Sequence, residues 1–226
     1  MGKAITMALA AAGSDVVIHY GSSAGPAEET AAEVEALGRR AVTVSADLAD
    51  PEAPAAIFTA ASALGPVQIL VNSAAPFPTD TVRDVTAAAF DATIAVTLRA
   101  PVLMTGEFAR RLPDGAAGTV VNVTDWRTAR PYPDHLSYVV AKGGLDTFTE
   151  AAAEALAPDI RVNAVALGAI LPPPGEGSEY LKALAREIPV QRVGGTDPVT
   201  RAVLFLVGNH FITGETIRLD GGAHLR

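Results

Sequence analysis

The chain has 226 residues, of which 49% are apolar and 19% charged, and this composition excludes general disorder and suits one globular domain. Seventeen basic and 25 acidic residues give a net charge of −8, so there is no positive field to attract nucleic acid. Cysteine is absent, which excludes disulfides and cysteine nucleophiles, and no apolar run approaches the roughly 18 residues that span a bilayer. We therefore expect a soluble, cytoplasmic protein without nucleic-acid or membrane partners.

The N-terminal segment predicts a first helix over about residues 3–12. Ile5, Leu9 and Ala12 recur at helical spacing, and Gly13 follows just before an apolar run. A myristoylation pattern and a short signal peptide fit the same residues less well.

Short β-branched runs then alternate with segments of helical composition. We predict strands over residues 15–20, 41–46, 67–72, 118–124, 160–166 and 215–220. We predict helices over residues 26–37, 51–64, 85–112, 136–156, 180–187 and 198–207. The strands at the centre of the chain show no polar alternation, so helices should cover both of their faces. The pattern predicts an α/β fold with a doubly wound parallel sheet of the Rossmann type, in a single domain over residues 1–226.

The carboxyl ends of parallel strands form the edge at which such sheets bind ligands. The polar and small residues that follow the predicted strands are Tyr20, Ser22, Ser23, Asp47, Asn72, Ser73, Ala74, Asp125 and Gly168. The stretch 171–178, rich in proline and glycine, follows the fifth strand, and we expect it to form a mobile flap over the site.

Tyr138 and Lys142 carry the clearest chemical signal in the sequence. They stand four residues apart in a predicted helix, so the phenol and the ammonium share one face. An ammonium favours the phenolate and so lowers the pKa of the phenol, which makes it a usable proton donor and acceptor near neutrality. A solvated helix face is the plainer interpretation of the same spacing. The four histidines show no metal-binding spacing, and we assign no metal.

With the later motifs, this pair resembles the short-chain dehydrogenase/reductase family over the whole chain. The matching residues are Tyr138-x-x-x-Lys142, Asp125 thirteen positions earlier, Arg161-Val162-Asn163-Ala164-Val165, Ile212-Thr213-Gly214 and Leu219-Asp220-Gly221-Gly222. Asp125 stands where most members have serine. With residues 122–127, 133–135 and 168–173, it looks most like the pteridine reductase and dihydromonapterin reductase branch.

The resemblance implies that a reduced nicotinamide delivers hydride while Tyr138 supplies the proton and Lys142 holds the ribose. An ionised Asp125 would repel the negative charge that develops on a ketone oxygen, but it suits a nitrogen-rich ring whose N–H groups donate to it. We therefore expect reduction of a C=N or C=O bond, with a dihydropterin as the first choice of substrate. Phe77 and Trp126 are candidate walls for a flat ring, or plain core. A 3-oxoacyl-(acyl-carrier-protein) or other carbonyl reductase is the alternative.

NADPH is the expected cofactor, in preference to NADH. No acidic residue follows the predicted strand that ends at Tyr20, whereas a carboxylate there would repel a 2′-phosphate, and two serines offer hydroxyls instead. The resemblance implies an adenine contact at Asp47 and close passage of the cofactor along residues 72–74. The full set of expected cofactor contacts is Gly2, Tyr20, Ser22, Ser23, Asp47, Leu48, Asn72, Ser73, Ala74, Tyr138, Lys142, Gly168 and Ile170.

Two features depart from the family pattern. Thr97 stands where members have an asparagine that supports a water link to the lysine, so we expect a weaker proton relay. No glycine-rich phosphate loop occurs in the sequence, and Gly2 aligns with the last glycine of that motif, so the first strand and most of the loop are missing. We expect Met1 to be an internal methionine of a longer chain. If the short form is real, a cofactor-free binding or oligomer-forming subunit is the alternative function.

Gly143 and Gly144 lie inside a predicted helix, where each costs about 1 kcal/mol relative to alanine. Close approach of another helix would offset this cost. The family forms dimers and tetramers through this helix and the long one before it, so the resemblance implies a homodimer or homotetramer. A packing need within one subunit is the alternative.

Overall fold

The computed structural model describes residues 1–172 and 177–226, in which helices and strands alternate along the chain. The strands are β1 (Val16–Tyr20), β2 (Ala41–Ser45), β3 (Ile69–Asn72), β4 (Gly118–Asp125), β5 (Ile160–Leu167) and β6 (Thr216–Leu219). The α-helices are α1 (Gly2–Ala11), α2 (Ala24–Ala36), α3 (Ala53–Ala61), α4 (Ala87–Ile94), α5 (Ala100–Arg111), α6 (Leu136–Leu156), α7 (Ser178–Glu187) and α8 (Thr196–Gly208). Residues 173–176 of the expected flap lie outside the described residues.

The described strands are all parallel, and they form two sheets rather than one. β1 pairs with β2, while β3, β4, β5 and β6 pair in that order. Among the described residues nothing lies in a ladder between β1 and β3, which is why the sheet is split at this place. The α/β class, the parallel strands and the doubly wound architecture are confirmed, whereas the continuity of the sheet is not seen in the described residues.

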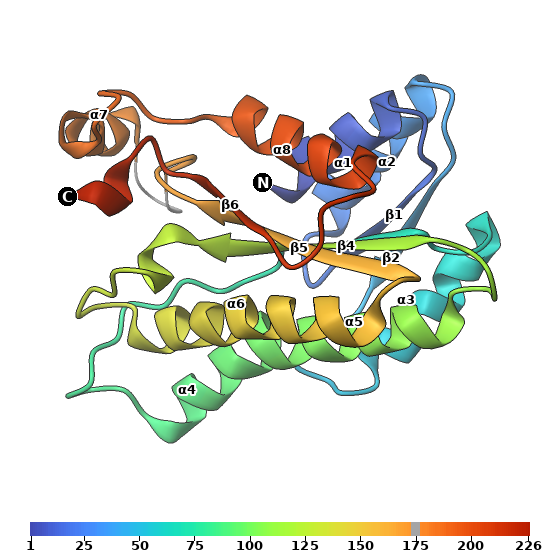
Figure 1. The fold of residues 1–226 in the computed structure, drawn as a ribbon, viewed down its shortest axis with the longest axis horizontal. Coiled ribbons are helices and arrows are strands. Elements are labelled where there is room, and N and C mark those ends of the chain that lie inside the picture. The colour runs from blue at the N-terminus through green and yellow to red at the C-terminus, as the bar shows by residue number, and fades with distance from the viewer. Residues whose placement is uncertain (173–176) are drawn as a thin grey trace.

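Helices cover both faces of the strands, as Figure 1 shows, with α1, α2 and α8 on one side and α4, α5 and α6 on the other. The side chains of β4 and β5 alternate between these two layers. Val120 and Val162 belong to the apolar cluster with Phe108 of α5, whereas Val121 and Val165 belong to the cluster with Leu206 of α8. Two apolar layers therefore fix β4 and β5 at the centre of the molecule, and this fixes what lies at their carboxyl ends.

Most element boundaries lie within two residues of those predicted from the sequence, and α6 has both predicted ends. The predicted helix over 85–112 differs internally, because a π-helical turn, η2 (Ala95–Arg99), separates α4 from α5. Thr97 lies in this turn and is fully buried. Turns of this kind are frequent at functional sites.

The helical stretch 87–111 corrects one expectation. The sequence has no uninterrupted apolar run of spanning length, but this helical stretch is long and apolar enough on average to cross a membrane. A core helix passes the same test, and the buried residues of this stretch, including Met104 and Phe108, lie on the side that packs against α3, α6 and β3.

Candidate active site

Asp125, Tyr138 and Lys142 come together at the carboxyl end of β4. Asp125 is the last residue of β4, and the other two lie in the first two turns of α6. The Tyr138 hydroxyl donates to Asp125 Oδ2 at 3.1 Å, and Lys142 Nζ donates to the carbonyl oxygen of Val123 at 2.5 Å. Lys142 Nζ also lies 5.6 Å from the centre of the Tyr138 ring. The predicted catalytic group is therefore one cluster of a carboxylate, a phenol and an ammonium.

Asp125 is held by its own backbone surroundings as well as by Tyr138. Its Oδ1 accepts a hydrogen bond from the backbone N–H of Arg127 at 2.9 Å, in the 3-10 turn η3 (Trp126–Thr128) that follows β4. The carboxylate therefore keeps one oxygen on the chain and directs the other at the phenol. This leaves the outer lone pairs of both oxygens as the acceptors that a substrate N–H could use.

The loop after β3 fixes the start of α6, which the sequence did not reveal. Asp80 is buried, its Oδ1 accepts the N–H of Ser137 at 3.2 Å, and its carbonyl oxygen accepts the N–H of Leu136. His135, just before the helix, adopts a left-handed backbone with φ 55° and binds the carbonyl oxygen of Pro78 through Nδ1. A carboxylate at a helix N-terminus is stabilised by the free N–H groups there. Asp80 thus sets the position of the helix that carries Tyr138.

Phe77, which the sequence left open as a wall of the site or plain core, packs against Tyr138 and His135. Its ring stacks on His135 with ring centres 3.8 Å apart and meets the Tyr138 ring edge-on at 4.8 Å. Phe77 is 42% exposed, so one side of the ring faces solvent. Trp126 begins η3 after β4, and the Arg127 guanidinium lies 5.2 Å from the centre of its ring and 3.8 Å from the centre of the Tyr132 ring.

Burial dominates the electrostatics of the catalytic group. It lowers the pKa of Lys142 to about 8, an effect that Asp125 and Asp146 partly oppose. Burial also raises the pKa of Asp125. The pKa of Tyr138 is raised, first by burial and then by the Asp125 carboxylate.

The predicted lowering of the Tyr138 pKa by Lys142 is therefore wrong for this state of the protein. Burial and then the carboxylate within hydrogen-bond distance raise the pKa of the phenol, while the ammonium donates to Val123 instead of to the phenol. Tyr138 consequently stands here as a neutral hydroxyl that donates a proton. That is the protonation state a reductase needs at the start of its reaction.

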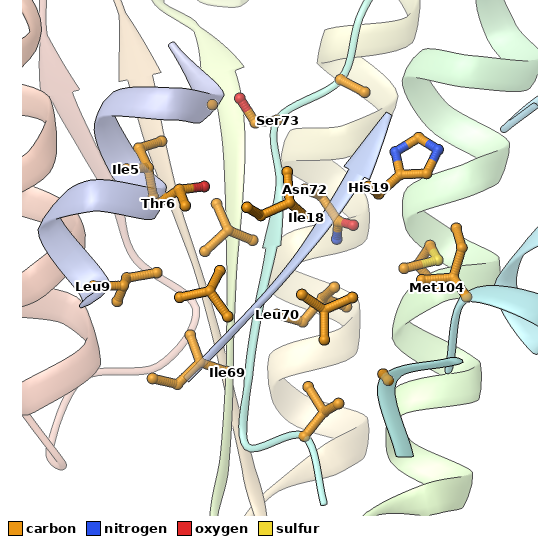
Figure 2. Close-up of a pocket in the computed structure, with 18 of the residues that line it drawn as sticks. Ile5, Thr6, Leu9, Ile18, His19, Ile69, Leu70, Asn72, Ser73 and Met104 are labelled. Atoms are coloured by element: carbon orange, nitrogen blue, oxygen red, sulfur yellow. The ribbon is translucent and has the colours of Figure 1, made fainter. Parts of the chain in front are cut away.

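A cavity of about 800 Å³ lies between β1 and β3, and none of the three catalytic candidates lines it. Seven of the expected cofactor residues do, namely Gly2, Tyr20, Ser23, Leu48, Asn72, Ser73 and Ala74. Figure 2 shows Ser73 near one end of this space, with the polar side chains of Thr6, His19 and Asn72 in the same half and the apolar ones of Leu9, Ile69, Leu70 and Met104 in the other half. The polar end is formed by the carboxyl ends of β1 and β3 together with the first turn of α1.

The remaining expected cofactor residues lie outside that cavity. Ser22 is exposed, and Asp47 is engaged in its own turn, where Oδ1 accepts the N–H of Ala49. Gly168 packs closely against the end of β6. A Cβ at this position would come within 2.6 Å of the Cα of Asp220. Ile170 is only 5% exposed and belongs to the apolar cluster under α8, so its side chain is core and only its backbone could face a ligand.

Asn72 takes part in a buried polar chain that sequence reasoning missed. Its Nδ2 donates to Asn122 Oδ1 at 2.9 Å, and Asn122 Nδ2 donates to Thr149 Oγ1 at 2.9 Å. This chain ties β3 to β4 and α6. Thr97 does not join it, and Thr97 Oγ1 has no hydrogen-bond partner within residues 1–172 and 177–226.

Gly144 is explained by packing inside the subunit. A Cβ at this position would lie 2.7 Å from Leu98 Cδ2, so the glycine lets α6 approach η2 closely. Gly143, in contrast, has no atom within 4 Å of a Cβ position. No group of three or more metal-binding side chains occurs in the described parts of the chain.

Comparison with known proteins gives matches along the whole chain. The protein family described as Enoyl-(Acyl carrier protein) reductase matches residues 1–224. L-xylulose reductase from Bos taurus is 35% identical over 233 residues, which cover 98% of this chain and 91% of that protein.

Solved structures match equally closely. FolM alternative dihydrofolate reductase 1 from Brucella canis, crystallised with NADP, is 36% identical with a TM-score of 0.93, and the match covers 100% of this chain and 90% of that one. A short chain dehydrogenase from Burkholderia cenocepacia in complex with NADP is 36% identical with a TM-score of 0.91, covering 98% of this chain and 92% of that one.

Proposed function

The chain belongs to the short-chain dehydrogenase/reductase family, and on that premise we propose that it is an NADPH-dependent reductase of a dihydropterin. Its relatives are named reductases and dehydrogenases, so the enzyme class is an NAD(P)-dependent oxidoreductase. The single observation that carries the narrower proposal is the position of the Asp125 carboxylate. It accepts a hydrogen bond of 3.1 Å from the hydroxyl of Tyr138, the proposed proton donor.

A carboxylate at this place selects the substrate by charge. A ketone oxygen gains negative charge as it is reduced, and a fixed carboxylate opposes that change. The amino and ring N–H groups of a pterin would instead donate to the free lone pairs of Asp125. A relative that is 36% identical is named an alternative dihydrofolate reductase, which supports a substrate of this chemical class.

The residues at the site fit the nicotinamide end of the cofactor. Lys142 has three N–H donors, and only the bond to the carbonyl of Val123 uses one, so two remain for ribose hydroxyls. When bound, reduced nicotinamide supplies the hydride. The hydride would go to the carbon of the C=N bond, Tyr138 would give its proton to the nitrogen of that bond, and Lys142 would stabilise the phenolate that remains.

The residues around Tyr20 fit NADPH better than NADH. Ser22 and Ser23 are exposed, and the Ser23 side chain makes no capping hydrogen bond to α2, so its hydroxyl is available to a phosphate. α1 likewise begins without a side-chain cap, which leaves its first N–H groups for an anion. Two relatives were crystallised with NADP, in agreement with this preference.

The test uses the purified chain in two steps. First, calorimetric titration with NADPH and with NADH measures cofactor binding, and we expect tighter binding of NADPH. Second, the fall in NADPH absorbance is followed with dihydropterins, with L-xylulose and with an acetoacetyl thioester. We expect turnover of a dihydropterin above that of either carbonyl compound. Turnover of a carbonyl compound alone would make the chain a carbonyl reductase, as the relationship to L-xylulose reductase would then suggest.

The variant Asp125→Ser separates the two substrate classes. Loss of the carboxylate should lower kcat/KM for the dihydropterin about 10- to 100-fold, because a substrate held by charge-assisted hydrogen bonds loses roughly 1.5 to 3 kcal/mol. Turnover of the ketone should rise or stay unchanged. Asp91→Ser, on an exposed position of α4, is the matched control and should change neither rate. Improved dihydropterin turnover in Asp125→Ser would refute the substrate proposal.

A further inference from the structure

The segment between β4 and α6, at the left in Figure 1, carries an arginine that the proposed reaction does not use. Arg127 lies in η3, two residues after Asp125, and its backbone N–H donates to Asp125 Oδ1 at 2.9 Å. In the part of the chain that the structure describes, its guanidinium makes no hydrogen bond or ion pair, so all of its N–H donors remain available. A half-buried cation therefore stands within the reach of one arginine side chain from the carboxylate assigned to the substrate ring.

Two aromatic rings fix the plane of this guanidinium. Its central carbon lies 3.8 Å from the centre of the Tyr132 ring and 5.2 Å from that of the Trp126 ring. A guanidinium that stacks on a ring uses its faces, so the N–H groups, which lie in its plane, stay directed outward. The stacking also reduces the conformational entropy that a flexible arginine loses when it binds an anion. Arg127 is thus pre-organised for a planar, bidentate acceptor.

A row of aromatic contacts leads from Arg127 back to the proposed proton donor. The Tyr132 ring meets the His135 ring edge-on, with ring centres 5.8 Å apart. His135 stacks on Phe77, which in turn meets the Tyr138 ring edge-on. Phe77, Tyr132 and His135 are all partly exposed, so a ligand can contact the row. A substrate that reacts at Tyr138 and extends along these rings with a flat aromatic group reaches Arg127 with its far end.

The charges around Arg127 decide which anion fits. Burial raises the pKa of Asp125, and the positive charge of Arg127 is one of the influences that oppose this rise, so the two side chains lie close enough to interact. Burial first, and then the charges of Asp125 and Asp134, raise the pKa of Tyr132, so Asp134 also lies near this arginine. One guanidinium between two carboxylates balances the single charge of a further carboxylate better than the nearly double charge of a phosphate.

We propose that Arg127 is a specificity-determining residue that binds a carboxylate at the far end of the substrate. The chain would then prefer a dihydropterin joined through an aromatic linker to an acidic tail over a dihydropterin with a neutral side chain. This inference rests on the proposed function for the identity of the ring, whereas the carboxylate subsite itself does not depend on it. Trp126 and Tyr132 hold the guanidinium and take no part in the transfer of hydride or proton.

Matched substrates test this preference in the purified chain. Dihydrofolate carries an aromatic linker and a carboxylate tail, whereas dihydrobiopterin has the same ring system and a neutral side chain. Arg127→Gln should lower kcat/KM for dihydrofolate at least about tenfold relative to dihydrobiopterin, because it removes one charge-assisted pair. The change should appear in KM with kcat nearly unchanged, since the tail binds equally in the ground state and the transition state. An equal effect on both substrates, or none on either, would overturn the proposal.

Further variants distinguish the guanidinium from a general effect of charge in this segment. Arg130→Gln removes an exposed cation three residues away, which no aromatic ring holds in the described segments, and it should leave the preference unchanged. Arg127→Lys keeps the charge without the planar fork and should keep only part of the preference. A preference lost in Arg130→Gln but kept in Arg127→Gln contradicts the assignment. Circular dichroism checks folding, and if Arg127→Gln does not fold, Tyr132→Leu removes the stacking and should reduce the preference about two- to fivefold.

Trp126 provides a test that needs no turnover, because it is the only tryptophan in the chain and lies beside Arg127. Its fluorescence is followed during titration with N-benzoylglutamate, which has an aromatic ring and carboxylates but no pterin, and with its neutral diamide as the control. We expect a saturable change with the acid alone, and at least about tenfold weaker binding of the acid by Arg127→Gln.

The two experiments fail in different ways. If neither dihydropterin is reduced, the proposed function is wrong, and the fluorescence titration still decides the carboxylate subsite. The subsite is refuted by the absence of a saturable change with the acid, by an equal change with the diamide, or by tighter binding of phenyl phosphate than of the acid.

Discussion

At the scale of one residue, Lys142 lowers the stability of the folded protein while it supplies hydrogen-bond donors to the site. The side chain is 2% exposed, and burial lowers its pKa from 10.5 to about 8, so holding the charge at neutral pH opposes folding. A shift of this size corresponds to about 3 kcal/mol. The lysine is therefore a destabilising residue that the fold retains for its donors.

The variant Lys142→Met should raise the free energy of unfolding at pH 7 by about 2 kcal/mol and abolish NADPH binding. This gain in the free energy of unfolding should become smaller as pH rises. The folded pKa lies below the unfolded one, so the wild-type chain loses stability as pH falls from about 10.5 through about 8. The difference in Tm between variant and wild type should thus shrink as pH rises across this window. A constant or growing difference in thermal melts from pH 7 to pH 11 would contradict the burial penalty.

At the scale of the element, two glycines differ in whether the surrounding structure leaves room for a side chain. Gly168 directly follows the last residue of β5, next to the end of β6, and a Cβ there would lie 2.6 Å from the backbone of Asp220. Gly143 lies in the interior of α6 with nothing near its Cβ position. The first is required by contact with a neighbouring backbone that cannot move aside, whereas the second costs helix stability without a contact inside the described fold.

Gly168→Ala should therefore destabilise the protein by about 1 to 3 kcal/mol, since β5 and β6 must separate. Gly143→Ala is the matched control and should stabilise the isolated chain by about 1 kcal/mol through helix propensity. Denaturant unfolding measures both. Destabilisation by Gly143→Ala, together with a smaller oligomer in light scattering, would show instead that α6 packs against another subunit at this position.

At the scale of the whole molecule, the split sheet predicts uneven stability. β4 and β5 lie between two apolar layers, while β1 and β2 form a two-stranded sheet whose β1 residues are all half-buried. Two-stranded sheets are weak unless a third strand or a helix supports them. The parts of the chain on either side of the cavity should therefore open at different free energies.

Amide hydrogen exchange of the free chain should show this difference directly. Amides of Val16–Tyr20 should exchange at least about tenfold faster than those of Gly118–Asp125, because opening β1 exposes less buried surface. The backbone amide of Asn122, whose side chain donates to Thr149, should stay protected with the rest of β4 and serves as the internal reference. Equal protection of both segments would mean that the chain unfolds as one cooperative unit.

Several properties of this protein could be predicted from the sequence because they depend on neighbours along the chain. Helical composition placed α6 at residues 136–156, and the spacing of Tyr138 and Lys142 on that helix put both side chains on one face. The alternation of apolar runs with helical segments gave the α/β class, since a parallel sheet needs a crossover after each strand. The absence of an acidic residue after Tyr20 pointed to NADPH.

Tertiary structure alone decided the rest. Asp80 reaches the start of α6 from 57 positions earlier, and no local pattern marks such a pair. The direction of the Tyr138 pKa depends on the burial of the phenol and on a carboxylate thirteen positions away, which faces it only once β4 and α6 are packed together. The open edges of β1 and β3 are likewise a property of pairing. Hydrogen bonds between strands join residues distant in the chain, so their absence becomes visible only in the folded molecule.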